Sequence, residues 1–348
     1  MITDRQVFAD DHIPDALPHR DGAVDRLARA FEPALRGDRP DDVLIHGPHG
    51  VGKTVLAQHT FSRLEQRTDA VSWMHIRSMG KSTAGIVRAT LQGLGADPAM
   101  NTPREDLCLQ LRQRVSHPTI VVLDEGDDLD SDPLRRLTDV PQIALVPIIH
   151  DLDDWLARVD DDIRRRLTGT DLHLDRYTVD ELVDILQPRV ANGLRGDVER
   201  DYLAQIADRA AGVAREAIQT LRAAAEIADG LGEPIERVSV ETAYQRALAD
   251  IRRANLQSLT FHHHVLYELL REHGPATSSE LYDAYDRVED EVYDNDIVPV
   301  SRRHRRNKLD KLATYKLIDQ AEAQHDTHEV CDASIASDLV DIPPLPEQ

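Results

Sequence analysis

Residues 47–54, Gly-Pro-His-Gly-Val-Gly-Lys-Thr, match the phosphate-loop pattern G-x-x-x-x-G-K-[ST] at every specified position. The glycines allow successive backbone N–H groups to curl around a phosphate, and the helix expected after the loop directs its positive dipole end toward the anion. Lys53 is expected to reach the β- and γ-phosphates of a nucleoside triphosphate, and Thr54 to hold Mg²⁺. The residues expected to contact ATP or ADP here are Gly47, Pro48, His49, Gly50, Val51, Gly52, Lys53, Thr54 and Val55.

A pair of acidic residues supplies the second part of a candidate catalytic site. Asp124 and Glu125 follow the apolar run Thr119–Leu123, and in parallel sheets active-site groups lie at the C-terminal ends of such strands. Asp124 is expected to bind Mg²⁺, directly or through water, and Glu125 to polarise the attacking water. An ordinary acidic loop is the alternative in an Asp-rich chain, but the position after a complete phosphate loop favours a catalytic pair.

The first block of the chain, residues 1–170, alternates apolar and amphipathic segments in a way that is typical of βαβ units around a parallel sheet. A helix is expected over Gly22–Leu35, before the first strand. The expected strands are Val43–His46, Ala70–Ile76, Thr119–Leu123 and Ile143–Ile149. These elements would position the phosphate loop and the acidic pair at one edge of the sheet.

Two further blocks follow, and both are mainly helical in pattern. Residues 171–255 contain no clear strand, and the expected helices there are Val179–Arg189, Val198–Ala210, Arg215–Asp229 and Val240–Leu259. Residues 256–335 predict three helices and a hairpin, which is the order of a winged helix-turn-helix. The segments of this block are Phe261–His273, a helix from Thr277 to about Val288, Ser301–Lys316, and the stretches Leu317–Ala323 and His328–Cys331. Residues 336–348 are expected to form a tail.

The chain is strongly acidic, with 63 acidic and 41 basic residues and a formal net charge of −22. Such a charge normally disfavours a nucleic-acid partner. At molar salt, however, the Debye length falls to about 3 Å, which removes most of the long-range repulsion. The Asp-rich, Lys-poor composition is expected of a halophilic protein that works in a salt-loaded cytoplasm, so the net charge does not exclude DNA.

The sequence also limits where the protein is expected to work. Cys108 and Cys331 are the only cysteines, which argues against a disulfide framework and favours a cytosolic setting. The N-terminal residues are polar and acidic, and no apolar run approaches the length of a membrane span. A cytoplasmic location without a membrane partner is therefore expected.

Several segments outside the phosphate loop carry a resemblance to a known family. They are Leu17–Asp21, Tyr177–Leu186 and Gly212–Arg215. With the phosphate loop and the C-terminal block, they make the chain resemble the archaeal origin-recognition and cell-division-control initiators, which are AAA+ ATPases with a C-terminal winged helix. The resemblance implies an α/β P-loop domain with αβα layers over residues 1–170, an all-helical lid over 171–255 and a winged helix-turn-helix domain over 256–335.

The resemblance also implies roles for residues that lie far from the phosphate loop in sequence. Arg20 and Tyr177 belong to segments expected near the nucleotide, and Arg215 matches the lid arginine that contacts the γ-phosphate, called sensor 2. The chain departs from the family at two positions. His150 stands where a polar sensor-1 residue, often Asn, is usual, and Asp162 stands at the position of the trans-acting arginine. Slow ATP hydrolysis is therefore expected, and the neighbouring Arg158 and Arg164–Arg166 are alternative sources of an arginine finger.

A basic segment in the C-terminal block is the candidate DNA contact. Ser301–Lys316 contains seven Arg and Lys residues against one acidic residue, Asp310. The residues expected to contact DNA are Arg302, Arg303, Arg305, Arg306 and Lys308, because the N-terminal half of a recognition helix enters the major groove. The alternative is a basic face that pairs with the acidic loop Glu289–Asp296. The predicted wing loop, Gln324–His328, is not basic.

Together these features predict an ATP-dependent, DNA-binding replication initiator that uses ATP/ADP and Mg²⁺ and binds duplex DNA at origin elements. A second copy of the protein and a replicative helicase are the further partners that this prediction includes. Two alternatives remain open: a signal-transduction P-loop NTPase acting as a transcriptional regulator, and a degenerate ATP-binding adaptor. The run His262–His264 is expected to be an ordinary part of a helix, because adjacent helical side chains diverge by about 100° and do not converge on one metal ion.

Overall fold

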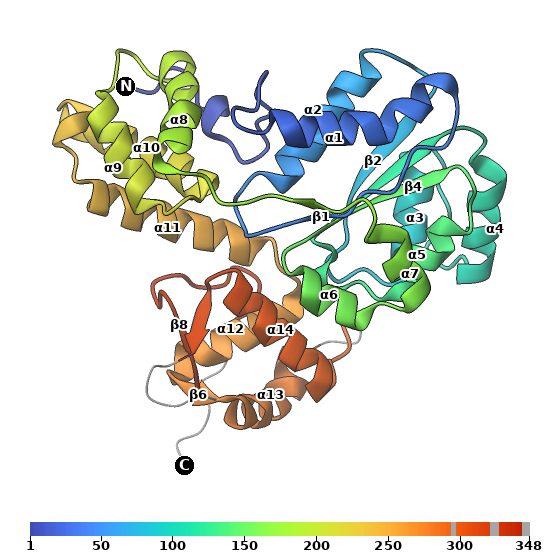
Figure 1. Cartoon of the computed structure of the whole chain (residues 1–348). Coiled ribbons are helices and arrows are strands. Elements are labelled where there is room, and N and C mark those ends of the chain that lie inside the picture. Colours follow the sequence, from blue (N-terminus) through green and yellow to red (C-terminus); the bar gives the residue numbers. More distant parts are fainter. Residues whose placement is uncertain (294–296, 321–326, 343–348) are drawn as a thin grey trace. The chain divides into compact units, whose positions relative to one another are not determined.

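The structure is a computed structural model that describes residues 1–293, 297–320 and 327–342 (Figure 1). The chain divides into two compact units, Met1–Tyr244 and Gln245–Gln348. The boundary lies within helix α11, Val240–Gln257, which also contains the boundary at residue 255 that the sequence predicts between its second and third blocks. The first predicted block and most of the second therefore belong to one compact unit.

A parallel sheet organises the first unit. Its order is β2-β3-β4-β1-β5, and every neighbouring pair is parallel. The strands are β1 (Ile45–His46), β2 (Ser72–Arg77), β3 (Thr119–Asp124), β4 (Ile143–Ile149) and β5 (Leu172–His173). Because β4 lies between β1 and β3, the segments that leave the C-terminal ends of these three strands are neighbours at one edge of the sheet.

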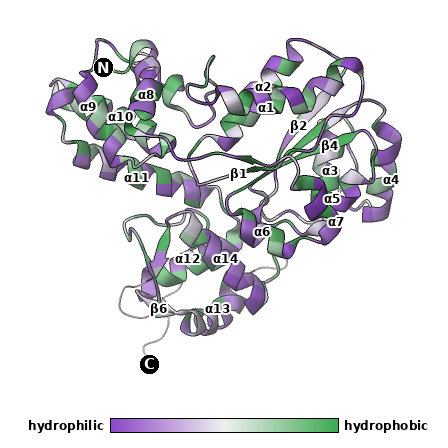
Figure 2. Cartoon of the chain, viewed as in Figure 1, coloured by the Kyte–Doolittle hydropathy of each residue, from purple (hydrophilic) through white to green (hydrophobic). Residues whose placement is uncertain are grey.

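Both faces of this sheet are covered by helices. Along β3, Ile120 and Val122 pack in one hydrophobic cluster, whereas Val121 and Leu123 pack in another, as the two-residue repeat of a strand requires. One face is covered by α1 (Asp21–Phe31) and α2 (Lys53–Glu65). The other is covered by α3 (Thr83–Gly93), α4 (Arg104–Arg114), α5 (Ser131–Thr138), α6 (Leu152–Arg158) and α7 (Asp161–Leu167). Hydrophobic residues dominate strand β4 in Figure 2, and the predicted αβα layering is confirmed.

The structure corrects the sequence prediction in two places in this layer. Strand β5 lies beyond residue 170, in a block that was expected to contain no clear strand; two residues are too short to produce a recognisable pattern. The helix expected over Gly22–Leu35 is α1, which ends at Phe31, and a 3₁₀ turn, η2 (Glu32–Arg36), follows it. Pro33 explains the change, since proline has no N–H to continue the α-helical hydrogen bonds.

The remaining helices of the first unit form a bundle that we call the helical subdomain: α8 (Val179–Gly193), α9 (Arg200–Arg209) and α10 (Ala214–Leu231). Helix α8 begins with a complete capping box, because the Thr178 side chain bonds the backbone of Glu181 and Glu181 bonds the backbone of Thr178. A short turn, η4 (Ile235–Arg237), leads from α10 to α11. The N-terminal turn η1 (Gln6–Phe8) packs against α8 and α10 (Figure 1).

The second unit has the element order that the winged-helix prediction requires. Its helices are α12 (Phe261–His273), α13 (Ser278–Val292) and α14 (Arg302–Thr314). Its antiparallel sheet has the order β6-β8-β7, with β6 at Ala276–Thr277, β7 at Ile318–Gln320 and β8 at Thr327–Val330. Residues 294–296 of the acidic loop and 324–326 of the predicted wing loop lie outside the described residues. Part of the predicted tail packs on this unit, since Val340 and Ile342 are buried.

Two of the three histidines in the run belong to the interior of the second unit. His263 and His264 are buried in α12, and burial lowers the pKa of His263 to about 2. Over the residues that the structure describes, His, Cys, Asp and Glu side chains form no group of three or more that could hold a metal ion. The same residues contain no helix with the length and apolar character needed to cross a membrane.

Candidate nucleotide site and basic helix

The phosphate loop connects the C-terminal end of β1 to the N-terminus of α2. Gly47 has a φ of +140°, and a Cβ there would lie 2.3 Å from the carbonyl oxygen of Leu174. Gly52 has a φ of +90° and stands at the N-cap of α2. Both positions therefore require glycine, and the loop leads into the N-terminus of α2, where backbone N–H groups and the helix dipole favour an anion.

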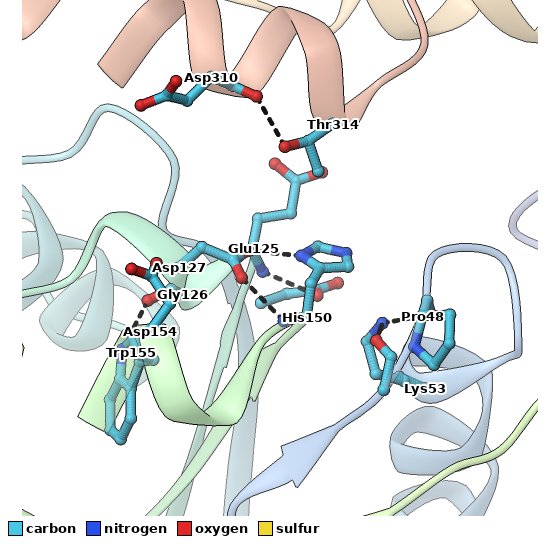
Figure 3. A network of polar contacts seen from close by, with 12 residues as sticks. Pro48, Lys53, Glu125, Gly126, Asp127, His150, Asp154, Trp155, Asp310 and Thr314 are labelled. Carbon is cyan, nitrogen blue, oxygen red and sulfur yellow. Dashed lines mark hydrogen bonds and ion pairs between the residues drawn. The ribbon is translucent and has the colours of Figure 1, made fainter. Parts of the chain in front are cut away.

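Lys53 is enclosed by this loop. Its side chain is buried, and Nζ donates to the carbonyl oxygens of Gly47 at 2.6 Å and Pro48 at 2.8 Å (Figure 3). These contacts hold the ammonium group at the loop, where a phosphate would be its counter-charge. The structure thus places Lys53 where the sequence motif predicts it.

Thr54 and Asp124 meet across the sheet edge. Thr54 Oγ1 donates to Asp124 Oδ2 at 2.8 Å, and His75 Nε2 lies 2.8 Å from the same oxygen. Burial by itself would raise the pKa of Asp124, but hydrogen bonds from His75, Thr54 and the Glu125 N–H outweigh it and hold the pKa below its usual value. A hydroxyl and an ionised carboxylate in contact form a set of hard oxygen donors, which fits Mg²⁺ bound through few protein ligands.

Glu125 is held by an arginine on the neighbouring strand. Its backbone has a φ of +53°, a left-handed conformation that is uncommon for a residue with a side chain. Arg77 donates to the Glu125 carboxylate from Nε at 3.1 Å and from Nη2 at 3.0 Å. No local sequence pattern marks Arg77 or His75 as part of this site. The two residues are two positions apart in β2 and therefore lie on the same face of the strand. Only the register of β2 on β3 places them beside Asp124 and Glu125.

His150 also lies at this edge, directly after β4. Its Nδ1 is 2.6 Å from Asp127 Oδ2, and its N–H donates to Asp127 Oδ1 at 2.8 Å (Figure 3). Its ring stacks on His49 of the phosphate loop, with centroids 3.3 Å apart. The turn that carries Asp127, η3 (Gly126–Asp128), is fixed by Trp155, whose Nε1 donates to the Gly126 carbonyl at 3.0 Å. His150 is therefore brought to the loop that the sensor-1 prediction requires it to face.

The helical subdomain contacts the phosphate loop through the start of α10. The N–H of Arg215 donates to the Gly50 carbonyl at 3.2 Å. The Arg215 side chain forms an ion pair with Asp10, at 2.6 Å between Nη2 and Oδ2. Arg215 is thus anchored beside the loop, while its guanidinium is bound to a carboxylate of the N-terminal segment.

Arg20 and Tyr177 form a second link to the loop. The Arg20 guanidinium stacks over the Tyr177 ring at 3.9 Å, and its Nε donates to the Tyr177 hydroxyl at 2.8 Å. Its Nη2 donates to the carbonyls of Asp175 at 2.7 Å and Val51 at 3.4 Å. Burial raises the pKa of Tyr177. The structure brings both predicted residues to the phosphate loop, with Arg20 joining it to the segment that enters α8.

Asp162, which the resemblance places at the position of the trans-acting arginine, forms an ion pair. Arg135 donates to both carboxylate oxygens of Asp162, at 2.9 and 2.7 Å, and this contact lowers the pKa of Asp162 to about 2. Of the neighbouring arginines, Arg158 pairs with Asp154 and Arg166 with Asp42. The source of an arginine finger stays a prediction.

A family model described as an AAA ATPase domain matches residues 16–145. The chain is 33% identical over 337 residues to ORC1-type DNA replication protein 9 of Halobacterium salinarum, and the match covers 94% of this chain and 92% of the relative. The chain belongs to the ORC1-type DNA replication proteins. The resemblance inferred from the sequence is confirmed, and the first unit of this ORC1-type protein contains the AAA ATPase domain.

Two further comparisons agree. ORC1-type DNA replication protein 1 of Halobacterium salinarum is 33% identical over 293 residues, which cover 82% of this chain and 95% of that protein. The structure of the Aeropyrum pernix ORC1 protein in complex with DNA is similar at a TM-score of 0.72 and 26% identity, covering 94% of this chain and 93% of that chain. The predicted AAA+ fold class is therefore confirmed for this ORC1-type protein.

The basic helix of the ORC1-type chain is α14, and one of its predicted DNA contacts is wrong. Arg305 is 5% exposed, and it donates to the carbonyls of Val300 at 2.9 Å and Tyr282 at 3.1 Å. Its guanidinium also pairs with Asp286 and stacks over the Tyr285 ring at 3.9 Å. Because every one of these partners belongs to the same unit, Arg305 stabilises the fold and is not available to DNA.

The other basic residues of α14 remain near the surface. Arg302, Arg303 and Arg306 are exposed, and Lys308 is half-buried. Arg302 pairs with Asp283 at 2.8 Å and Asp286 at 3.2 Å, two acidic residues of α13. The alternative of a basic face paired with acidic residues of the same unit thus applies to Arg302 and Arg305, although the acids come mainly from α13 and not from the predicted loop.

Proposed function

We propose that this protein is an ATP-dependent, DNA-binding replication initiator whose nucleotide state controls its activity. The observation that carries the proposal is the convergence at the phosphate loop of Thr54 with Asp124 from the sheet edge and of Arg215 from the helical subdomain. A site built from both parts of the first unit is suited to report the bound nucleotide as a change in their relative angle.

The residues of the loop would hold the nucleotide. Backbone N–H groups at the start of α2 and the Lys53 ammonium would bind the phosphates, and Thr54 with Asp124 would hold Mg²⁺. When bound, Mg²⁺ supplies positive charge that neutralises the charge developing on the phosphates. His75 would keep the Asp124 carboxylate ionised and oriented, as its 2.8 Å contact indicates.

Hydrolysis would be slow in this arrangement. Glu125 is the residue that would polarise the attacking water, but its carboxylate is engaged in a two-bond ion pair with Arg77. With Asp162 in place of the trans-acting arginine, a second source of positive charge is also missing from that position. Comparing ATP turnover of the unmodified protein with that of Glu125→Gln tests the enzymatic part. Equal rates would show that Glu125 catalyses nothing.

Duplex DNA would be bound by the exposed side chains of α14, and the replication role would be expressed at origin elements. A relative with 26% identity has been solved in complex with DNA, which supports this partner. Nuclease footprinting on genomic DNA tests the proposal, with protection of repeated origin elements as the expected result. Protection at a promoter would instead support a transcriptional regulator. The origin-bound protein would then self-associate and recruit a helicase in the cytoplasm.

An ATP-binding adaptor is the second candidate. The Asp162–Arg135 pair favours it, because a carboxylate at the finger position cannot stabilise transferring phosphate charge in a neighbouring subunit. ATP binding without turnover and without any protected DNA would support the adaptor and overturn the initiator.

A further inference from the structure

The N-terminal segment, residues 1–12, is docked on the helical subdomain. Phe8 is completely buried, and a Cβ at Gly193 would lie 2.6 Å from its ring, so α8 presents a glycine to admit it. The backbone is bonded as well: the N–H of Thr3 donates to the Gly193 carbonyl at 2.8 Å, and the N–H of Arg195 donates to the Met1 carbonyl at 2.9 Å. The segment is therefore a built part of this unit.

Two polar side chains fix the end of the segment that approaches the phosphate loop. Gln219 on α10 donates from Nε2 to the Phe8 carbonyl at 2.9 Å and to Asp10 Oδ1 at 3.3 Å. Buried Arg189 on α8 donates to the Val7 carbonyl. Because Phe8 and Val7 are held on both sides, the Asp10 carboxylate has a defined position, where it contacts both Gln219 and Arg215, two residues one helical turn apart on α10.

At that position Asp10 binds Arg215 through two nitrogens. Nη2 lies 2.6 Å from Oδ2, and Nε lies 3.1 and 3.2 Å from the two carboxylate oxygens. The other end of Arg215 is at the phosphate loop: its N–H is bonded to Gly50, and a Cβ at Gly50 would lie 3.3 Å from the Arg215 Cβ. A single residue, Arg215, thus contacts the loop expected to hold the phosphates through its backbone and a carboxylate of the N-terminal segment through its guanidinium.

We propose that Asp10 sets the discrimination between nucleoside triphosphate and diphosphate, by competing with the terminal phosphate for Arg215. The proposal rests on the nucleotide site described above. Carboxylate and phosphate oxygens are matched by the same two-pronged face of arginine, so one occupant excludes the other. A triphosphate displaces Asp10 and loosens the N-terminal segment, whereas a diphosphate lacks the terminal group and leaves the Asp10–Arg215 pair intact.

The competition lowers triphosphate affinity by the free energy of the pair that must open. Both side chains are partly exposed, Asp10 by 50% and Arg215 by 31%, so the pair is weaker than a buried one. Removing the competitor is expected to tighten triphosphate binding about three- to fivefold. Diphosphate binding is expected to stay unchanged.

The test compares Asp10→Asn with Asp11→Asn in the full chain at molar potassium chloride. Asp11 is the matched control: it removes one negative charge at the next position, and its partner is Gln6, not Arg215. Isothermal titration calorimetry measures the affinity of each variant for a non-hydrolysable ATP analogue and for ADP. Tighter analogue binding by Asp10→Asn alone, with ADP affinity unchanged, is the expected result. Equal analogue affinity of Asp10→Asn and the unmodified protein would overturn the proposal.

Two additional measurements separate this proposal from the one on which it rests. In an Arg215→Ala background, Asp10→Asn should have no effect on analogue affinity; a persisting gain would show that Asp10 acts by general charge repulsion and would refute the competition. Hydrogen exchange of the Ala9 and His12 amides should quicken with the analogue but not with ADP, and exchange that ignores the analogue would refute displacement. If the unmodified protein binds neither nucleotide, the proposed function itself fails.

Discussion

Replacing Arg305 by Ala distinguishes a residue that stabilises the second unit from one that contacts DNA. The substitution removes hydrogen bonds to the Val300 and Tyr282 carbonyls, the ion pair with Asp286 and the stacking on Tyr285. Hydrogen bonds and cation–π contacts of this kind contribute about 1 kcal/mol each. Since Asp286 is partly exposed, its ion pair contributes about 1 kcal/mol or less. We expect Arg305→Ala to lower the free energy of unfolding by about 3 kcal/mol.

Chemical denaturation followed by circular dichroism measures this loss, and Arg306→Ala is the matched control. Arg306 lies on the same helix but is exposed, so its removal should change the free energy of unfolding by less than about 0.5 kcal/mol. Arg306→Ala should instead weaken duplex binding and reduce the slope of log affinity against log salt by about one unit. The reasoning is refuted if Arg305→Ala is as stable as Arg306→Ala and weakens DNA binding as much.

Three further predictions concern the stability of each unit and the catalytic pair. Gly47→Ala should lower the free energy of unfolding by about 2 kcal/mol or more, because the added Cβ would meet Leu174 and the φ of residue 47 is positive. Gly22→Ala is the control in the same denaturation assay: its Cβ would meet no atom within 4 Å, so this substitution should not destabilise the protein. Arg77→Ala should raise ATP turnover, measured as phosphate release, because it frees the Glu125 carboxylate. Arg67→Ala, at an exposed position, is the control. A lower turnover in Arg77→Ala would mean that Arg77 positions Glu125 productively. Burial lowers the pKa of His263 to about 2 in the folded protein. As the pH falls, the His263 side chain is therefore protonated in the unfolded chain before it is protonated in the folded protein. The free energy of unfolding should fall below about pH 6.5, by about 1.4 kcal/mol per pH unit. His263→Gln should remove that part of the pH dependence in denaturation series, and an unchanged slope would contradict the assignment.

The nucleotide site could be predicted where its signal is local. The phosphate loop is a contiguous motif, and the apolar run before Asp124 predicts a buried strand. The sequence therefore assigns Lys53, Thr54 and Asp124 to one site, and in the structure Lys53 bonds the loop and Thr54 bonds Asp124, while their roles toward a nucleotide stay predictions. His75 and Arg77 were missed because their contacts depend on the register of β2 on β3, which no local pattern specifies. Contacts between residues far apart in sequence require the fold.

The basic helix shows the opposite error, in which a local pattern was trusted too far. Arg305 shares its helical face with the buried Leu309 and Leu312, so the spacing already placed it toward the interior. The positive charge of Arg305 nevertheless led to the prediction of an exposed position. The sequence does not reveal that Asp286 and two backbone carbonyls from other segments bind the buried guanidinium. A buried charge is predictable only when its partners are known.

The bond between Trp155 and the Gly126 carbonyl has a practical consequence for spectroscopy. The chain contains two tryptophans. Trp155 is buried beside the turn that follows Glu125, and Trp73 stacks on Phe61 at 5.0 Å, so both belong to the first unit. Intrinsic tryptophan emission therefore reports on the AAA+ unit alone, whereas circular dichroism reports on both. Recording the two signals in one titration resolves which unit a substitution unfolds, without any introduced label.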